Sequence, residues 1–168
     1  MADITYLILS SFAIIMPAYI ANSIPVLSRG KHPVDLGRNF TDGKRILGDG
    51  KTFEGTALGL FFGTLVGTGY TLLTGSPSAY IFYSFMLALG ALVGDMLGAF
   101  IKRRMNIPRG ASAPVLDQLD FVVGALLFLA PFYPISWAQV LIVILVTPPI
   151  HLFTNYLAYR LKLKPNPW

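Results

Sequence analysis

The sequence predicts an all-α integral membrane protein with five transmembrane helices, and three observations support this fold class. Of the 168 residues, 54% are hydrophobic and only 12% are charged, a balance well below the charge that a soluble domain normally carries. Five stretches approach or exceed the roughly 20 helical residues that cross a bilayer core of about 30 Å. The lysines and arginines are confined to the connections expected on one side of the membrane.

The predicted spans comprise residues 4–27, 56–73, 80–101, 120–136 and 137–159, all within a single membrane-embedded domain of residues 1–168. The first stretch lacks a basic start and is longer than the apolar core of a signal peptide, so we expect it to be retained. Pro131 and Pro134 mark the turn between the fourth and fifth spans.

Two spans carry glycines at helical spacing. They are Gly55, Gly59, Gly63 and Gly67 in the second span, and Gly90, Gly94 and Gly98 in the third. Because lipid gives no hydrophobic drive for helix association, small residues on one face let helices approach closely. The stripes therefore predict helix contacts, with the alternative that Gly94 or Gly98 leaves room for a ligand beside Asp95.

The basic residues predict the orientation of the spans. They lie between the first two spans (Arg29, Lys31, Arg38, Lys44, Arg45 and Lys51), between the third and fourth (Lys102, Arg103, Arg104 and Arg109) and after the fifth (Arg160, Lys162 and Lys164). Because basic residues near span ends tend to stay in the cytoplasm, we expect the N-terminus outside and the C-terminus in the cytoplasm. Residues 28–55 and 102–119 then form two long cytoplasmic loops, which we expect to form the site.

The first of these loops has the composition of a phosphate-binding segment. Its glycines let backbone N–H groups approach oxyanions, and the start of the second span offers a positive helix end. The candidate binding residues are Lys44, Arg45, Gly48, Asp49, Gly50, Lys51 and Thr52. Attraction to anionic lipid head groups is the simpler explanation of loop cations, and it is the one preferred for Arg29 and Lys31.

Three aspartates predict a metal site. Asp95 lies seven residues before Lys102, so it sits roughly 10 Å deeper than the basic helix end, and an acid at that depth is a functional candidate. Asp117 and Asp120 share a helix face. Converging carboxylates repel one another unless a cation binds, and oxygen ligands beside phosphate suit Mg²⁺. The structural alternative is a pair of salt bridges, Asp95 to Lys102 and Asp117 to Arg109.

Residues of both loops resemble the CDP-archaeol synthase family, the archaeal branch of the CDP-diacylglycerol synthase (phosphatidate cytidylyltransferase) group. The segment from Ile46 to Phe53 is similar to the first cytoplasmic loop of the archaeal enzymes. Gly94-Asp95-Met96, Lys102-Arg103 and Asp117-Gln118-Leu119-Asp120 resemble the Gly-Asp-Leu, Lys-Arg and Asp-Arg-x-Asp patterns of the wider group. The resemblance covers nearly the whole chain, and Gln118 in place of arginine fits the compact archaeal branch.

This resemblance implies the transfer of CMP from CTP to unsaturated archaetidic acid, a geranylgeranyl diether of glycerol 1-phosphate, with release of pyrophosphate. CTP, the ether lipid phosphate and membrane lipids are the expected partners, Mg²⁺ is the expected cofactor, and no nucleic acid is expected to bind. Asp95, Asp117 and Asp120 are expected to bind the metal. Lys44, Arg45 and Lys51 are expected to hold the β and γ phosphates, and Lys102, Arg103 or Arg109 the lipid phosphate.

Two other classes of function stay open. A CTP-dependent kinase of isoprenoid alcohols would use the same loops but release a nucleoside diphosphate. A small transporter should show polar residues along a whole path or inverted repeats, whereas Asn22, Asp95 and His151 interrupt the predicted spans without suggesting such a path. The chain has no cysteine, so a thiolate metal site and a cysteine nucleophile are excluded.

Overall fold

The structure is a computed structural model that describes residues 3–28 and 30–167, and Arg29 of the first loop lies outside this part. The described residues form five α-helices and one short 3-10 helix. In chain order they are α1 (Ile4–Ser23), η1 (Ile24–Leu27), α2 (Phe53–Thr74), α3 (Ala79–Arg104), α4 (Leu116–Leu129) and α5 (Trp137–Arg160). The predicted all-helical fold is confirmed.

Four segments of the described chain are long and apolar enough to cross a membrane, namely residues 4–27, α2, α3 and α5. Helix α4 differs from the fourth span predicted for residues 120–136, because it begins at Leu116 and ends at Leu129. Its 14 residues extend only about 21 Å at a rise of 1.5 Å per residue. Pro131 and Pro134 lack the N–H groups that would continue the helix, and residues 130–136 form turns and irregular backbone instead.

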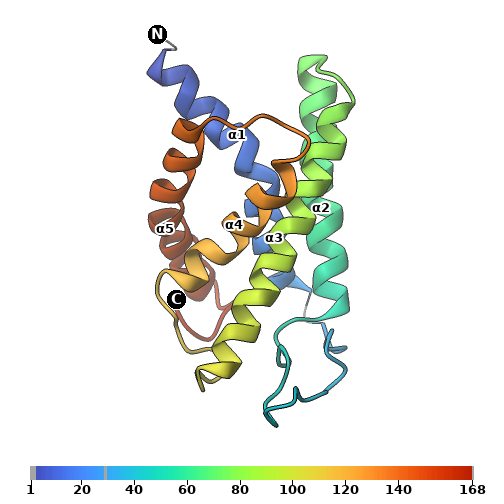
Figure 1. The fold of residues 1–168 in the computed structure, drawn as a ribbon, viewed down its shortest axis with the longest axis vertical. Helices are drawn as coiled ribbons and strands as arrows, with labels where there is room; N and C mark the ends of the chain where they lie inside the picture. The colour runs from blue at the N-terminus through green and yellow to red at the C-terminus, as the bar shows by residue number, and fades with distance from the viewer. Residues whose placement is uncertain (1–2, 29, 168) are drawn as a thin grey trace.

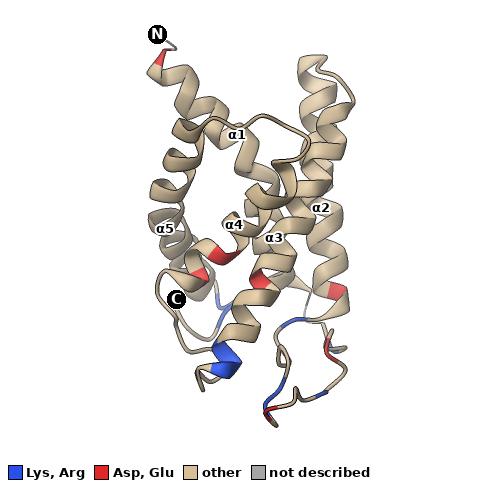
Figure 2. Cartoon of the chain, viewed as in Figure 1, with Lys and Arg blue, Asp and Glu red and all other residues tan. Residues whose placement is uncertain are grey.

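Consecutive helices run in opposite directions along the bundle, and α4 crosses its middle obliquely (Figure 1). Helix α3 packs against α1, α2 and α4, whereas α5 packs, among the described elements, only against α1 and α4. The long connections of residues 30–52 and 105–115 lie at the end where α5 finishes, opposite the N-terminus (Figure 1). Figure 2 shows that most charged residues gather at this same end.

The buried core is small and lies between α1, α3 and α4. Ile15, Phe121 and Leu129 are each at most 2% exposed. Many large apolar side chains point outward instead, among them Leu73, which is 88% exposed, and Leu145, which is 72% exposed. Extended exposed apolar surface is expected where a protein contacts lipid.

The glycine stripes bring α2, α3 and α4 into close contact. Gly55, Gly59, Gly63 and Gly67 are the buried residues of α2. A Cβ atom built on Gly63 would lie 2.6 Å from the Cβ of Ala88, and one on Gly90 would lie 2.5 Å from the carbonyl oxygen of Gly124. The predicted helix contacts are confirmed. Gly94 and Gly98 both face Asp120, so α4 fills the space beside them.

Candidate active site

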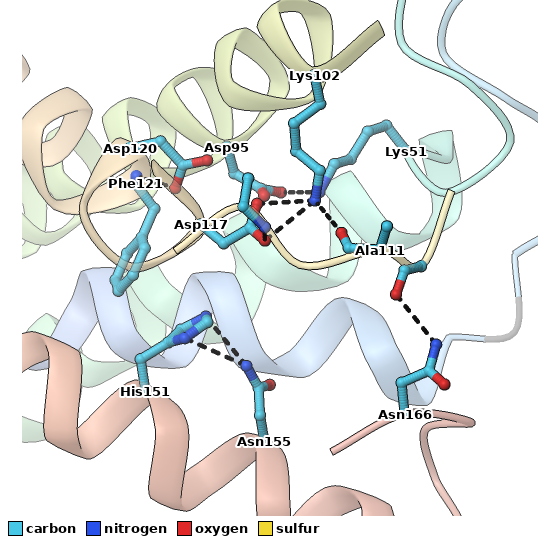
Figure 3. A network of polar contacts seen from close by, with 12 residues as sticks. Lys51, Asp95, Lys102, Ala111, Asp117, Asp120, Phe121, His151, Asn155 and Asn166 are labelled. Carbon is cyan, nitrogen blue, oxygen red and sulfur yellow. Dashed lines mark hydrogen bonds and ion pairs between the residues drawn. The ribbon is translucent and has the colours of Figure 1, made fainter. Parts of the chain in front are cut away.

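The three candidate aspartates come together where the end of α3 meets the start of α4 (Figure 3). Asp120 packs against Gly98, one turn beyond Asp95 on the same face of α3. The charge of Asp120 interacts with those of Asp95 and Asp117. Its Oδ1 accepts a 2.6 Å hydrogen bond from the backbone N–H of Phe121. The missing side chain of Gly98 is what admits this carboxylate.

Two lysines neutralise two of these carboxylates. Lys51 Nζ pairs with Asp95 Oδ2, and Lys102 Nζ lies 2.8 Å and 3.0 Å from the two carboxylate oxygens of Asp117. The pairs considered from the sequence, Asp95 with Lys102 and Asp117 with Arg109, are therefore wrong in their partners. Lys102 extends forward from the end of α3 to the start of α4, and the first loop brings Lys51 to Asp95.

Asp117 also shapes the loop of residues 105–115. Its Oδ2 accepts a 2.8 Å hydrogen bond from the N–H of Ala113, while Lys102 donates to the carbonyl oxygen of Ala111 at 2.9 Å. The chain reverses after α3 at Asn106, whose φ of 59° lies in the left-handed region that asparagine tolerates better than most residues. This reversal lets Lys102 and Asp117 meet.

Asp95 and Asp120 offer the ligands that Mg²⁺ prefers. This ion is usually held by one or two carboxylates together with substrate phosphates and water, and neighbouring carboxylates that repel each other are stabilised by a cation. Within residues 3–28 and 30–167, no group of three or more His, Cys, Asp or Glu side chains forms a metal-ligand set. Both oxygens of Asp117 are bonded to Lys102, and one also accepts from the N–H of Ala113, whereas Asp95 bonds Lys51 through Oδ2 alone, so Asp95 and Asp120 fit a metal ion better than the full triad.

Asp35 organises the first loop, although its role was missed in the sequence. Its buried carboxylate accepts hydrogen bonds from the N–H groups of Gly37, Leu47 and Gly48 and from the guanidinium of Arg45. Burial alone raises the pKa of Asp35, but these donors outweigh it and hold the pKa well below its ordinary value. An aspartate two residues before a glycine is a turn signal that points to such a role.

Several of the candidate phosphate-binding residues have structural partners within this loop. Arg45, besides bonding Asp35, lies 2.8 Å from Asp49. The hydroxyl of Thr52 caps α2, accepting a 3.2 Å hydrogen bond from the N–H of Gly55. The side chains of Arg45, Asp49 and Thr52 therefore stabilise the loop itself. Lys51 instead pairs with Asp95 of α3.

Arg104, which was assigned only to topology, ties the first loop to the end of α3. It pairs with Asp42 at 2.7 Å, donates to the carbonyl oxygen of Arg45 at 2.6 Å and lies 4.4 Å from the ring centroid of Phe100. Lys44 in turn donates to the carbonyl oxygen of Arg104 at 3.0 Å. The run of three cations from Lys102 to Arg104 was the available signal for this contact.

Gly48 lies beside Arg103 at the end of α3, and Gly50 lies beside Arg109 in the loop that follows α3. A Cβ atom on Gly48 would lie 3.8 Å from Arg103 Nη1, and one on Gly50 would lie 3.7 Å from Arg109 Nε. Gly48 has a φ of 91°, which favours glycine. Arg103 Nε is buried and has no hydrogen-bond partner among the described residues. Because a buried donor without a partner is unfavourable, an anion beside Gly48 would stabilise this arrangement.

A cavity of about 280 Å³ lies at the opposite end of the bundle and is lined by residues of α1, α2 and α3 that include Tyr6, Tyr70 and Tyr80. At a rise of 1.5 Å per residue, Tyr80 lies roughly 22 Å along α3 from Asp95. The cavity is therefore separate from the charged site.

An apolar helical bundle with lysines, arginines and aspartates gathered at one end defines a multi-pass membrane protein suited to a phosphorylated substrate. The chain belongs to the CDP-archaeol synthase family, because the family described as CarS-like, CDP-archaeol synthase, matches residues 4–168. The predicted family and its function in archaeal membrane lipid biosynthesis are confirmed. So is the coarser prediction of a cytidylyltransferase.

Similar proteins support this assignment over nearly the full length. A CDP-archaeol synthase of Pyrococcus furiosus is 48% identical over 164 residues, covering 96% of this chain and 98% of the relative. One from Sulfolobus acidocaldarius is 50% identical over 155 residues, covering 91% and 93%. A solved structure of an intramembrane enzyme for archaeal membrane lipid biosynthesis is 42% identical with a TM-score of 0.82, covering 88% of this chain and 94% of that one.

Proposed function

We propose that this protein transfers CMP from CTP to unsaturated archaetidic acid and releases pyrophosphate, with Mg²⁺ as its cofactor. Family membership supports CTP and archaetidic acid as substrates, because the synthesis of CDP-archaeol implies both. The location of the site is supported mainly by the buried Nε of Arg103, which has no hydrogen-bond partner among the described residues and whose side chain lies beside Gly48. Phosphate oxygens are the acceptors that this donor and its neighbouring cations would bind.

In the proposed reaction, an oxygen of the lipid phosphate attacks the α-phosphorus of CTP. A new P–O bond forms there, the bond from the α-phosphorus to the oxygen bridging to the β-phosphorus breaks, and pyrophosphate leaves with that oxygen and its electron pair. The protein needs no nucleophile of its own, because positioning and charge neutralisation supply most of the rate in phosphoryl-type transfer.

Each part of the site has a role in this proposal. Lys51, Arg103 and Arg109 bind the triphosphate along Gly48 and Gly50. Asp95 and Asp120 would hold Mg²⁺, which when bound neutralises charge on the reacting phosphates. Lys102 holds Asp117 and with it the start of α4, so that Asp120 stays beside Asp95.

We also propose that the site faces the cytoplasm, with the N-terminus outside and the C-terminus inside. The segregation of the basic residues supports this orientation, as does the position of both long connections at the charged end of the bundle (Figure 2). CTP then reaches the site from the cytoplasm while the isoprenoid chains of the lipid stay in the bilayer.

The proposal is tested by incubating the purified protein with CTP labelled in the cytosine ring, Mg²⁺ and a set of lipid phosphates. We expect lipid-linked CMP and pyrophosphate in equal amounts with the unsaturated ether lipid phosphate. The main alternative, a CTP-dependent kinase of isoprenoid alcohols, would release CDP and leave no label on the lipid. Label found only in CDP would overturn the proposed reaction.

A further inference from the structure

Residues 38–46 of the first loop form a short hairpin. Asn39 and Arg45 pair as an antiparallel bridge, and the N–H of Phe40 donates to the carbonyl oxygen of Lys44 at 2.8 Å. These bonds give the hairpin its shape, whereas its position against the helices depends on contacts outside it. Because an isolated two-stranded hairpin is only marginally stable in water, those contacts decide where this hairpin lies and how well it is ordered.

The last residue of α3, Arg104, supplies such contacts. Its Nε pairs with Asp42 at 2.7 Å, and its Nη2 donates to the carbonyl oxygen of Arg45 at 2.6 Å. The guanidinium also lies 5.3 Å from the ring centroid of Phe40 in the hairpin and 4.4 Å from that of Phe100 in α3, distances at which a cation is attracted to an aromatic ring. One side chain therefore joins the hairpin to the end of α3.

The hairpin leads directly into the part of the loop that lies at the site. Gly48 follows the hairpin by two residues and lies beside Arg103, the neighbour of Arg104 in α3. Lys51 follows by five residues and pairs with Asp95. The attachment of the hairpin at Arg104 thus limits where Gly48 and Lys51 can lie.

Among the described residues, the first loop makes polar contacts with α3 in two places, which are the group around Arg104 and the pair of Lys51 with Asp95. In the proposed reaction Asp95 binds Mg²⁺ and Lys51 binds the triphosphate, so this pair opens when the site is occupied. The contacts of Arg104 use no side chain that the proposed reaction assigns to substrate or metal. They can therefore hold the loop on α3 after the pair has opened.

We propose that Arg104 is a positioning residue for CTP, which keeps the hairpin on α3 so that Gly48, Gly50 and Lys51 stay at the triphosphate site. This inference rests on the proposed function. Without Arg104 the hairpin would leave α3 for part of the time, and a ligand that binds only the docked form has an apparent Kd raised by the inverse of the docked fraction. A hairpin docked about a tenth of the time would raise the Kd for CTP about ten-fold.

The test compares Arg104→Gln with the matched control Arg160→Gln. Arg160 is the last residue of α5, and it contacts Tyr156 four residues before it, as Arg104 contacts Phe100. We expect Arg104→Gln to raise the Kd for CTP, measured with Mg²⁺, about ten-fold or more. The kcat at saturating CTP and the KM for lipid phosphate should stay close to wild type, and Arg160→Gln should match wild type throughout. A wild-type Kd for CTP in Arg104→Gln would overturn the inference.

A cross-link distinguishes positioning from direct contact with phosphate. The chain has no cysteine, and the ring centroids of Phe40 and Phe100 lie 5.3 Å apart, so a short bifunctional thiol reagent can join Phe40→Cys to Phe100→Cys. In the Arg104→Gln background this link should restore CTP affinity, because it keeps the hairpin near α3 without the guanidinium. Affinity that stays low after cross-linking would mean that Arg104 binds phosphate itself, which would overturn the positioning role.

Hydrogen exchange measures the docking of the hairpin without any substrate. The N–H groups of Phe40 and Ile46 are bonded inside the hairpin, and they should exchange faster in Arg104→Gln than in wild type and Arg160→Gln. A purely structural role would instead lower Tm and speed exchange within α3, with an unchanged Kd for CTP, and would overturn the inference. Failure of the wild type to form lipid-linked CMP would overturn the proposed function, whereas faster exchange in the hairpin of Arg104→Gln would still show that Arg104 holds it.

Discussion

Lys51 joins the first loop to α3 through its ion pair with Asp95, and a bound triphosphate would compete with that carboxylate for the ammonium group. We expect Lys51→Ala to weaken CTP binding about ten-fold or more, because a charge-assisted phosphate contact contributes roughly 1.5–3 kcal/mol. Titration calorimetry with CTP measures this effect. Lys31→Ala is the matched control, since Lys31 is an exposed cation of the same loop. Equal CTP affinity in Lys51→Ala and wild type would remove Lys51 from the site.

Asp95 and Asp120 are the residues at which a structural role and a metal-binding role give opposite results. Replacing either with asparagine keeps the size of the side chain but removes the charge that a hard cation requires. We expect turnover to fall on the order of a hundred-fold or more, with the fold retained. Turnover against Mg²⁺ concentration and Tm are measured together for both variants. Near-normal turnover in the folded variants, or wild-type turnover that survives EDTA, would exclude the metal site.

The hydrogen bonds of Asp35 lead us to expect that the first loop loses stability in acid. Its pKa is lower in the folded protein than in the unfolded chain, so its contribution to stability is present above the ordinary aspartate pKa of roughly 3.9. That contribution is lost as the pH falls through and below this value. Limited proteolysis of residues 30–52 should therefore accelerate in acid, and Asp35→Asn should already be susceptible at pH 7. A loop equally resistant in Asp35→Asn would show that other contacts hold it.

The sequence identified the chemical residue types of the site better than their partners. An aspartate within an apolar span and cations beside glycines are visible in the sequence alone, so Asp95 and Lys51 were both identified as candidates. The pairing of Lys51 with Asp95 depends on how the first loop folds around Asp35 and Arg104, contacts that link residues far apart in the chain.

At the scale of helices, α2 predicts that alanine substitution has different effects on stability at its buried and its open glycines. We expect Gly63→Ala to lower Tm by overpacking, at a cost of about 1–3 kcal/mol, since its Cβ would lie 2.6 Å from that of Ala88. Gly69 of the same helix has no atom within 4 Å of a built Cβ. Gly69→Ala should therefore be neutral or slightly stabilising, because alanine favours helix by up to about 1 kcal/mol. Equal Tm values for the two variants would contradict the contact.

The helices themselves were predictable because a membrane-spanning segment needs a long apolar stretch, and residues 4–27, α2, α3 and α5 provide one. Helix α4 was less predictable, since apolar residues continue past its end as far as Pro134. Proline and turn geometry, not hydropathy, decide where it stops. The close approach of Gly90, Gly94 and Gly98 to α4 then fixes the height of Asp120 against Asp95.

At the scale of the molecule, the architecture reconciles substrates of opposite solubility. The outer surfaces of the helices are apolar, while the charged residues form one end of the bundle (Figure 2). A lipid substrate whose chains remained among the helices would present only its phosphate at that end. In the proposed reaction, a water-soluble nucleotide would reach the same place through the two polar loops, so neither substrate would have to leave its own solvent.

The orientation of this molecule is testable because the chain contains no cysteine, so single cysteines report unambiguously. With both long loops in the cytoplasm, Thr41→Cys and Ala111→Cys should react with an impermeant thiol reagent only from the cytoplasmic side, and Ser76→Cys only from outside. The short helix α4 makes Ile135→Cys the most informative position. Figure 1 shows the connection from α4 to α5 in the half of the molecule that contains the N-terminus, so we expect labelling from outside. Labelling of Ile135→Cys only from the cytoplasm would mean that α4 does not cross the bilayer. Labelling of Ser76→Cys and Ala111→Cys from the same side would contradict the proposed orientation of the whole bundle.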